Sequence, residues 1–184
     1  MSTVYQRRVE QEWRLLQLLA NTNPAIIESV RRAQEVRGAV FSFSLQRTRA
    51  LVGSLGDFQF RDSHAVMLHF PEFFPSVPIE ASLVSPVFHP NVHPENGFVC
   101  LWGRFTPGDT VREAVSQLQR VITWELLNEE SDHLMQPAAI AWYKDALRDI
   151  ELPLRYEAVS KPAEFQEQRT YALRPPRSHR RRLD

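Results

Sequence analysis

The sequence predicts an α+β fold with an N-terminal helix, an antiparallel meander sheet of about four strands, an irregular cysteine-bearing stretch and C-terminal helices. Apolar residues repeat with helical spacing near the N-terminus and again after residue 110. Between these regions, apolar and polar residues alternate from 41 to 46. Because the strands follow one another without intervening helices, we expect the sheet to be antiparallel.

The first predicted element is an amphipathic helix that begins near residue 4. Thr3 and Gln6 have the spacing of a capping box, and the apolar positions 9, 13, 16 and 19 fall on one face. The segment 21–24 ends this helix. The apolar spacing over residues 25–37 predicts a second, short helix that follows Asn23-Pro24, although the β-branched pair at 26–27 disfavours this helix.

Short strands are predicted after Gly38. Phe41, Phe43 and Leu45 alternate with polar residues, as in a half-buried antiparallel strand. Further runs bounded by Gly, Asp, Ser and Pro continue the meander over 48–53, 57–62, 64–70 and 80–85. The prolines at 71, 75 and 78 exclude a central strand and predict a rigid, extended connection.

Two helices are predicted in the C-terminal half. The first begins with a capping box formed by Thr110 and Glu113 and runs to about Leu127. The second begins at Pro137, a residue favoured in the first helical turn.

From Pro153 onward the helical periodicity fades. A short helix is expected over 163–169, and the arginine-rich end of the chain is expected to be disordered. The expected organisation is therefore one domain over 1–152 and a C-terminal extension over 153–184.

Composition excludes several classes of function. The 22 basic and 22 acidic residues cancel, so binding to nucleic acid is not expected. No apolar run approaches the roughly 20 residues that a membrane span requires. We therefore expect a cytoplasmic protein, and the reducing conditions of that compartment suit a lone thiol. No cofactor is expected.

Cys100 is the only cysteine in the chain. Because the chain offers no partner for an intramolecular disulfide, the possible roles of this thiol are packing, metal binding, redox sensing and nucleophilic attack. His89 and His93 could join Cys100 as zinc ligands, but the prolines at 90 and 94 disfavour the helix that this spacing needs. A Cys-His hydrolase would need a histidine beside the thiol, and the sequence cannot place His64, His69 or His133 there.

The central motifs resemble those of ubiquitin-conjugating enzymes. A proline-rich connection over 69–78 leads to a His-Pro-Asn triplet at 89–91, and Gly-x-x-Cys-Leu follows at 97–101. The Phe-Thr-Pro sequence at 105–107 resembles the next loop of that family. The resemblance implies the family's fold over about residues 3–150. It also implies that Cys100 carries a ubiquitin-like modifier as a thioester, received from an activating enzyme and passed to an amine of a target protein.

The resemblance also assigns roles around Cys100. Asn91 would stabilise the oxyanion that forms when the amine attacks the thioester. His89, Pro90 and Gly97 would support the site. Asn91 precedes Cys100 by nine positions, whereas the family usually has eight.

An acidic residue would lower the pKa of the acceptor amine or take its proton. The family keeps such a residue in the loop between the two helices that follow the cysteine. Here this loop covers residues 128–134, and Asp132 is the candidate. The loop is one residue longer than the family pattern, so Glu130 is a second candidate.

Surfaces for partners follow from the same resemblance. In the family the first helix docks on the activating enzyme, and Arg7, Arg8 and Arg14 lie on its polar face here. A solvated face with no partner is the alternative for these arginines. Phe74 and Pro107 lie in the two loops expected to contact partners.

Two broader interpretations complete the prediction. The chain has 20 arginines and 2 lysines, which indicates GC-rich coding and a bacterial-type member of the family. For such a member, the resemblance suggests a conjugation operon that serves antiviral defence. The alternative function is an inactive scaffold that keeps the fold and binds a ubiquitin-like protein. The presence of Cys100, Asn91 and Gly97 favours activity.

Overall fold

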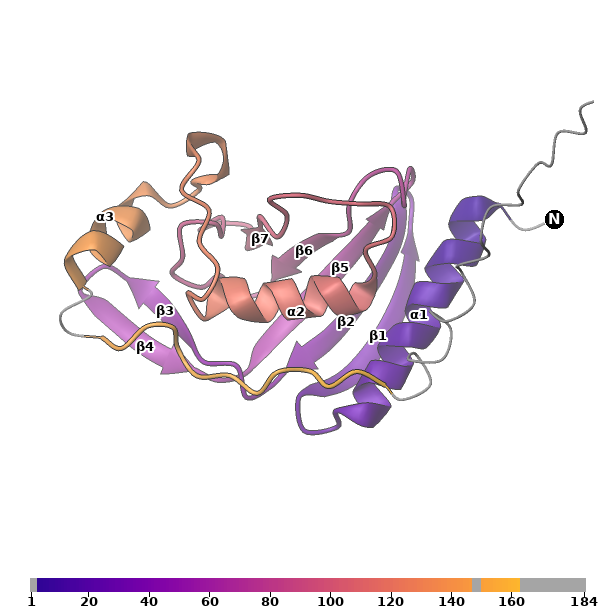
Figure 1. The fold of residues 1–184 in the computed structure, drawn as a ribbon, viewed down its shortest axis with the longest axis horizontal. Helices are drawn as coiled ribbons and strands as arrows, with labels where there is room; N and C mark the ends of the chain where they lie inside the picture. Colours follow the sequence, from indigo (N-terminus) through magenta and orange to yellow (C-terminus); the bar gives the residue numbers. More distant parts are fainter. Residues whose placement is uncertain (1–2, 147–149, 163–184) are drawn as a thin grey trace, which may run out of the picture.

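The computed structural model describes residues 3–146 and 150–162 and has the predicted α+β architecture (Figure 1). The elements in chain order are α1 (Val4–Thr22), β1 (Ile27–Glu35), β2 (Gly38–Leu45), β3 (Ala50–Ser54), β4 (Asp57–Arg61), β5 (His64–Pro71), β6 (Glu80–Leu83), β7 (Phe98–Val99), α2 (Val111–Ile122), the 3₁₀ helix η1 (Ser131–His133) and α3 (Pro137–Ala146). Within the described ranges, none of the helices has the length and apolar character needed to cross a membrane.

The main sheet contains β1, β2, β5, β6 and β7 in that spatial order, and every neighbouring pair is antiparallel. Phe41 of β2 lies opposite Leu68 of β5, and Phe43 lies opposite Val66, so these side chains share one buried face. The strands predicted over 48–53 and 57–62 form a separate hairpin, β3-β4. This hairpin interrupts the expected meander between β2 and β5.

The prediction of a short helix over 25–37 is wrong, because residues 27–35 form strand β1. The strand pairs with β2, but a bulge shifts the register between Glu28 and Arg31, where Ser29 has a φ of 55°. A bulge breaks the alternation of side chains, which hides the period of two in the sequence.

Helix α2 has the predicted capping box, in which Thr110 and Glu113 cap each other. It ends at Ile122 instead of near Leu127. Trp124 has a φ of 66°, and its buried side chain packs in a second apolar cluster with Phe88. The chain leaves the helix early because this packing turns Trp124 away from the helical path.

Residues 150–162 run as an extended strap from the α3 side of the molecule, along α2, to the end of α1 (Figure 1). The Leu154 N–H donates to the Thr123 carbonyl at 2.7 Å, and the Ser160 N–H donates to Asn23 Oδ1 at 2.7 Å. The first part of the predicted extension therefore packs on the domain. The helix expected over 163–169 and the arginine-rich end lie outside the described residues.

Candidate active site

The cysteine-bearing stretch folds back on itself, so Asn91 and Cys100 are neighbours. The Cys100 N–H donates to the Asn91 carbonyl at 2.9 Å. The His93 N–H donates to the Phe98 carbonyl at 2.8 Å, which closes the intervening turn. The additional residue between Asn91 and Cys100 is thus accommodated in this turn and does not separate the two backbones.

Gly97 is required at the end of the turn. Its φ is 69°, and a Cβ atom at this position would lie 2.0 Å from the Leu83 carbonyl oxygen of β6. The Leu83 N–H in turn donates to the Gly97 carbonyl at 2.9 Å. Only a residue without a side chain allows the turn to approach β6 this closely.

His89 is fully buried beneath the turn. Its Nδ1 atom accepts a hydrogen bond from the Asn91 N–H at 3.1 Å, and its ring meets that of Trp124 edge-on. Burial lowers the pKa of His89 to about 3, so the ring is neutral at physiological pH. The ring thus contacts both the turn and Trp124, and its role in supporting the site stays a prediction.

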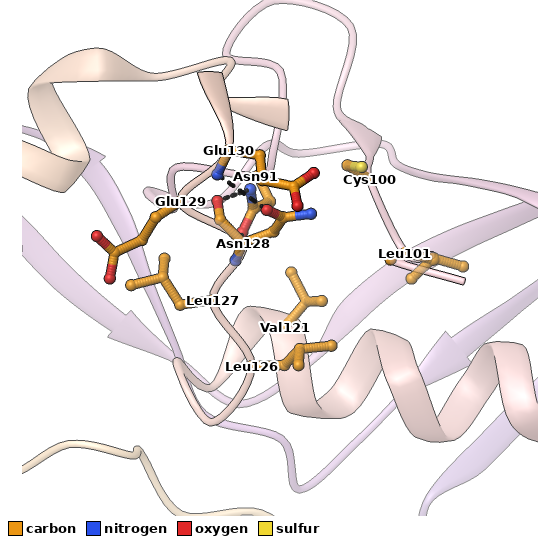
Figure 2. Close-up of a pocket in the computed structure, with 10 residues that line it drawn as sticks. Asn91, Cys100, Leu101, Val121, Leu126, Leu127, Asn128, Glu129 and Glu130 are labelled. Carbon is orange, nitrogen blue, oxygen red and sulfur yellow. Dashed lines mark hydrogen bonds between the residues drawn. The ribbon is translucent and has the colours of Figure 1, made fainter. Parts of the chain in front are cut away.

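The side-chain amide of Asn91 holds the loop that follows α2. Nδ2 donates to the carbonyls of Asn128 at 2.8 Å and His133 at 2.9 Å, and Oδ1 accepts from the Asn128 N–H at 2.9 Å. Figure 2 shows Asn91 and Asn128 joined in this way. Because both amide protons are used, the observed role of Asn91 is to position the loop. Its role at an oxyanion stays a prediction.

Further hydrogen bonds bind the same loop to the His-Pro-Asn triplet and to the residues that flank it. The Pro90 carbonyl accepts the Met135 N–H at 2.7 Å. Gln136 donates from Nε2 to the Val87 carbonyl at 3.0 Å and the Val92 carbonyl at 2.8 Å. The triplet therefore anchors both ends of the loop over 128–136.

The loop brings His133 to the thiol. The Sγ atom of Cys100 and the Nδ1 atom of His133 lie 2.8 Å apart, so one proton can be shared between them. On the other side of the ring, Nε2 lies 3.5 Å from Oε2 of Glu130. Local patterns in the sequence could not pair His133 with Cys100, because the two residues are 33 positions apart.

Cys100 and Asn91 line a cavity of about 470 Å³ together with residues 126–130 (Figure 2). Its acidic lining residues are Glu129 and Glu130. Asp132 lies in η1, is exposed and accepts a hydrogen bond from the Ser131 hydroxyl. The proposed role of Asp132 therefore needs the carboxylate to act from outside the lining of this cavity, whereas Glu130 is already part of it.

Burial raises the pKa of the Cys100 thiol, and a backbone hydrogen bond from Trp102 acts in the opposite direction. The described residues that line the cavity include no lysine or arginine. A thiolate at this position consequently has no fixed cation in the cavity to stabilise it.

The three residues considered as zinc ligands do not converge. His89 Nδ1 accepts the Asn91 N–H, and His93 Nδ1 accepts the N–H groups of Glu95 at 3.2 Å and Asn96 at 3.4 Å. Over residues 3–146 and 150–162, no group of three or more His, Cys, Asp or Glu side chains is arranged to hold a metal ion.

The residues expected to contact partners differ in exposure. Phe74 is only 2% exposed and packs on Phe70, whereas its neighbour Phe73 is 70% exposed. Phe74 is therefore not exposed as its predicted role requires, and Phe73 is the exposed aromatic residue of this loop. Contact of the loop with a partner stays a prediction. Pro107 is exposed in the loop before α2.

The three arginines of α1 are also held differently. Arg8 pairs with the buried Glu12 and donates to the Asp109 carbonyl, so it joins α1 to the start of α2. Arg7 is exposed, and Arg14 is exposed while paired with Glu10 one turn earlier. Arg7 and Arg14 are thus exposed on the surface of α1, as their predicted role requires, whereas Arg8 is part of the helix packing.

Comparison with known proteins identifies the fold. No family model and no curated protein sequence matches the chain. A solved structure of a ubiquitin conjugating enzyme from Trypanosoma cruzi matches with a TM-score of 0.56 and 18% identity, over 81% of this chain and 96% of that one. A ubiquitin conjugating enzyme from Plasmodium yoelii matches with a TM-score of 0.51 and 17% identity, over 80% of this chain and 88% of that one. The chain therefore has the fold of ubiquitin-conjugating enzymes.

Proposed function

We propose that this protein carries a ubiquitin-like modifier as a thioester on Cys100 and transfers it to an amine of a target protein. The observation that supports this proposal best is the position of Cys100 at an open cavity beside a loop that Asn91 and Pro90 hold in place. The fold of the two solved neighbours agrees with it.

The proposed reaction has two steps. The Cys100 sulfur attacks the carbonyl carbon of the thioester on the activating enzyme, whose cysteine leaves as a thiol. An amine then attacks the new thioester and Cys100 is released. Glu130 or Asp132 would assist the amine in losing its proton. The partners proposed for this reaction are an activating enzyme, a modifier and a target, and the proposed location is the cytoplasm, whose reducing conditions suit a lone thiol.

A loading assay tests the thioester. The full chain is incubated with ubiquitin whose C-terminus is activated as a mercaptoethanesulfonate thioester, which removes the need for an activating enzyme. We expect a ubiquitin adduct on Cys100 that disappears with dithiothreitol, and Cys100→Ala should form none. An adduct that survives the reductant, or that forms equally on Cys100→Ala, would exclude thioester chemistry at this residue.

The alternative is an inactive scaffold that binds a ubiquitin-like protein without turnover. The raised pKa of Cys100 is the observation that favours it, because a protonated thiol is a poor nucleophile. The same assay separates the two functions, since a scaffold would bind ubiquitin without forming the adduct. The bacterial-type assignment and the link to antiviral defence rest on composition and resemblance alone and stay predictions.

A further inference from the structure

The thioester carrier proposed above leaves one group at the site without a function. The imidazole of His133 lies 2.8 Å from the Cys100 sulfur, and its side chain is 29% exposed, so solvent reaches part of the ring. Carrying a thioester requires the thiol alone. The contact therefore points to a step in which a proton moves.

The position of the ring is enforced by the fold. The His133 carbonyl accepts a hydrogen bond from the buried Asn91, and the Met135 N–H two residues later donates to Pro90. Glu130 lies 3.5 Å from the opposite nitrogen, Nε2, and favours the tautomer that carries its hydrogen there. In that tautomer Nδ1 has a free lone pair directed at the sulfur.

The surroundings of Cys100 make a base useful. The thiol is held in a cavity whose described lining residues carry two carboxylates and no positively charged side chain. Neither the surroundings nor burial favours a free thiolate. A neighbouring base that removes the proton during attack overcomes this difficulty.

We propose that His133 is the general base of Cys100, and that it allows the loaded protein to pass its cargo to a hydroxyl group as well as to an amine. This inference rests on the proposed function, and it names the class of acceptor that the same site accepts.

In the loading step, the Cys100 S–H proton moves to Nδ1 of His133 while the sulfur forms a bond to the donor's thioester carbon. The bond from that carbon to the donor's sulfur then breaks. The departing thiolate takes the proton from Nδ1, so the donor ends as a neutral thiol, the His133 ring ends neutral, and no oxidant or reductant is needed.

In the transfer step, Cys100 is acylated and Nδ1 is free to serve the acceptor. A hydroxyl oxygen attacks the thioester carbon while its proton moves to Nδ1, and the bond from that carbon to the Cys100 sulfur breaks. The imidazolium then returns the proton to the thiolate. An amine is a stronger nucleophile and attacks without losing a proton in the same step, whereas a hydroxyl depends on the base. His133 should therefore matter more for ester formation than for amide formation.

The test compares the full chain with His133→Gln and with His69→Gln. Glutamine keeps a backbone carbonyl for Asn91 but cannot act as a base. His69 is the matched control, because it also faces a glutamate, but its Nδ1 atom lies 3.0 Å from Glu80 on the sheet where that of His133 meets the Cys100 sulfur. Melting temperatures of the three proteins are compared first.

Each protein is loaded from the ubiquitin thioester, freed of excess donor and mixed with N-acetyl-threonine amide or N-acetyl-lysine amide at neutral pH. Esters are identified by cleavage with hydroxylamine, which leaves amides intact. We expect His133→Gln to lower the rate of ester formation about 100-fold and that of amide formation less than about 10-fold. His69→Gln should match the unmodified chain in both.

Alkylation of Cys100 by iodoacetamide tests the base independently of any cargo. We expect alkylation at neutral pH to slow about 10-fold in His133→Gln and not in His69→Gln. Equal ester formation by the unmodified chain and His133→Gln would overturn the inference, as would a loaded protein that forms amides but no ester. If none of the three proteins forms a thioester, the proposed function is wrong and the inference about hydroxyl acceptors is wrong with it. Equal alkylation rates in all three proteins would separately exclude His133 as the base.

Discussion

The cysteine-bearing stretch 89–101 and the start of the loop 128–136 both contribute residues to the same cavity, but different interactions hold the stretch and the loop in place (Figure 2). The stretch is bound by backbone hydrogen bonds within its own turn and to β6. The loop is bound to the stretch largely through the Asn91 amide, the Pro90 carbonyl and the Gln136 amide, and its acidic side chains are exposed.

This difference separates the nucleophile from the groups that move protons. Cys100 is on the part of the site whose displacement would break the sheet edge. His133 and Glu130 are on a part that can shift when a few side-chain contacts change. We therefore expect substitutions in the stretch to lower stability, and substitutions in the loop to lower activity with little effect on stability.

The largest effect is expected from Gly97→Ala, which disrupts the stretch. The added Cβ would meet the Leu83 carbonyl, and the positive φ adds strain, so we expect a loss of about 4 kcal/mol in the free energy of unfolding. Gly56→Ala is the matched control, since Gly56 has a φ of 90° with nothing near its added Cβ. It should cost about 1 kcal/mol. Urea denaturation measures both, and equal losses would show that the approach to β6 is unimportant.

Asn91→Ala separates the two regions. It removes the three hydrogen bonds of the buried Asn91 side chain, for which we expect a loss of about 3 kcal/mol in stability. It should also slow alkylation of Cys100, because His133 is no longer held beside the sulfur. Asn96→Ala is the control, since the exposed Asn96 accepts one hydrogen bond, from the Phe98 N–H. If Asn91→Ala lowers the free energy of unfolding no more than Asn96→Ala does, Asn91 does not hold the loop, and the oxyanion role is the one that remains for it.

Acidification should weaken the stretch through His89. Its folded-state pKa is lowered to about 3. An unfolded imidazole titrates near pH 6.5, so between these values the unfolded chain binds a proton that the folded chain does not. This stabilisation is complete above about pH 6.5 and decreases as pH falls, by about 2 kcal/mol at pH 5.

The pH effect is measured as the difference between the unmodified chain and His89→Asn, in which an oxygen can replace Nδ1 as acceptor. The comparison removes the contribution of Glu12, whose burial raises its pKa and which acts with the opposite sign. Parallel pH profiles for the two proteins would show that His89 does not couple protonation to folding.

The smallest effect is expected for the exposed acidic residues of the loop. Glu130 is 80% exposed and 3.5 Å from His133, so Glu130→Gln should slow discharge of the loaded thioester about threefold. Asp132→Asn should slow discharge less, and neither should change the melting temperature. A larger effect of Asp132→Asn on transfer to lysine would favour Asp132 as the acid that acts on the acceptor amine.

Local sequence patterns predicted much of the fold. The capping boxes of α1 and α2 and the alternation in β2 depend on residues within a few positions of one another. The prediction for residues 25–37 failed because a bulge in β1 hides its alternation, and α2 was predicted too long because the packing of Trp124 is not a local property. Patterns within one segment do not record the distant surface against which it packs.

The sequence by itself determined the α+β class, the first helix, the central strand and the placing of Cys100 after a His-Pro-Asn triplet. Only the tertiary structure decided that Asn91 holds the following loop, that Phe73 and not Phe74 is exposed in its loop and that His133 meets the thiol. Helical and strand periods arise from backbone geometry and can be read along the chain. A contact between Cys100 and His133 depends instead on how two loops, separated by a helix, are fastened together by buried amide and carbonyl groups.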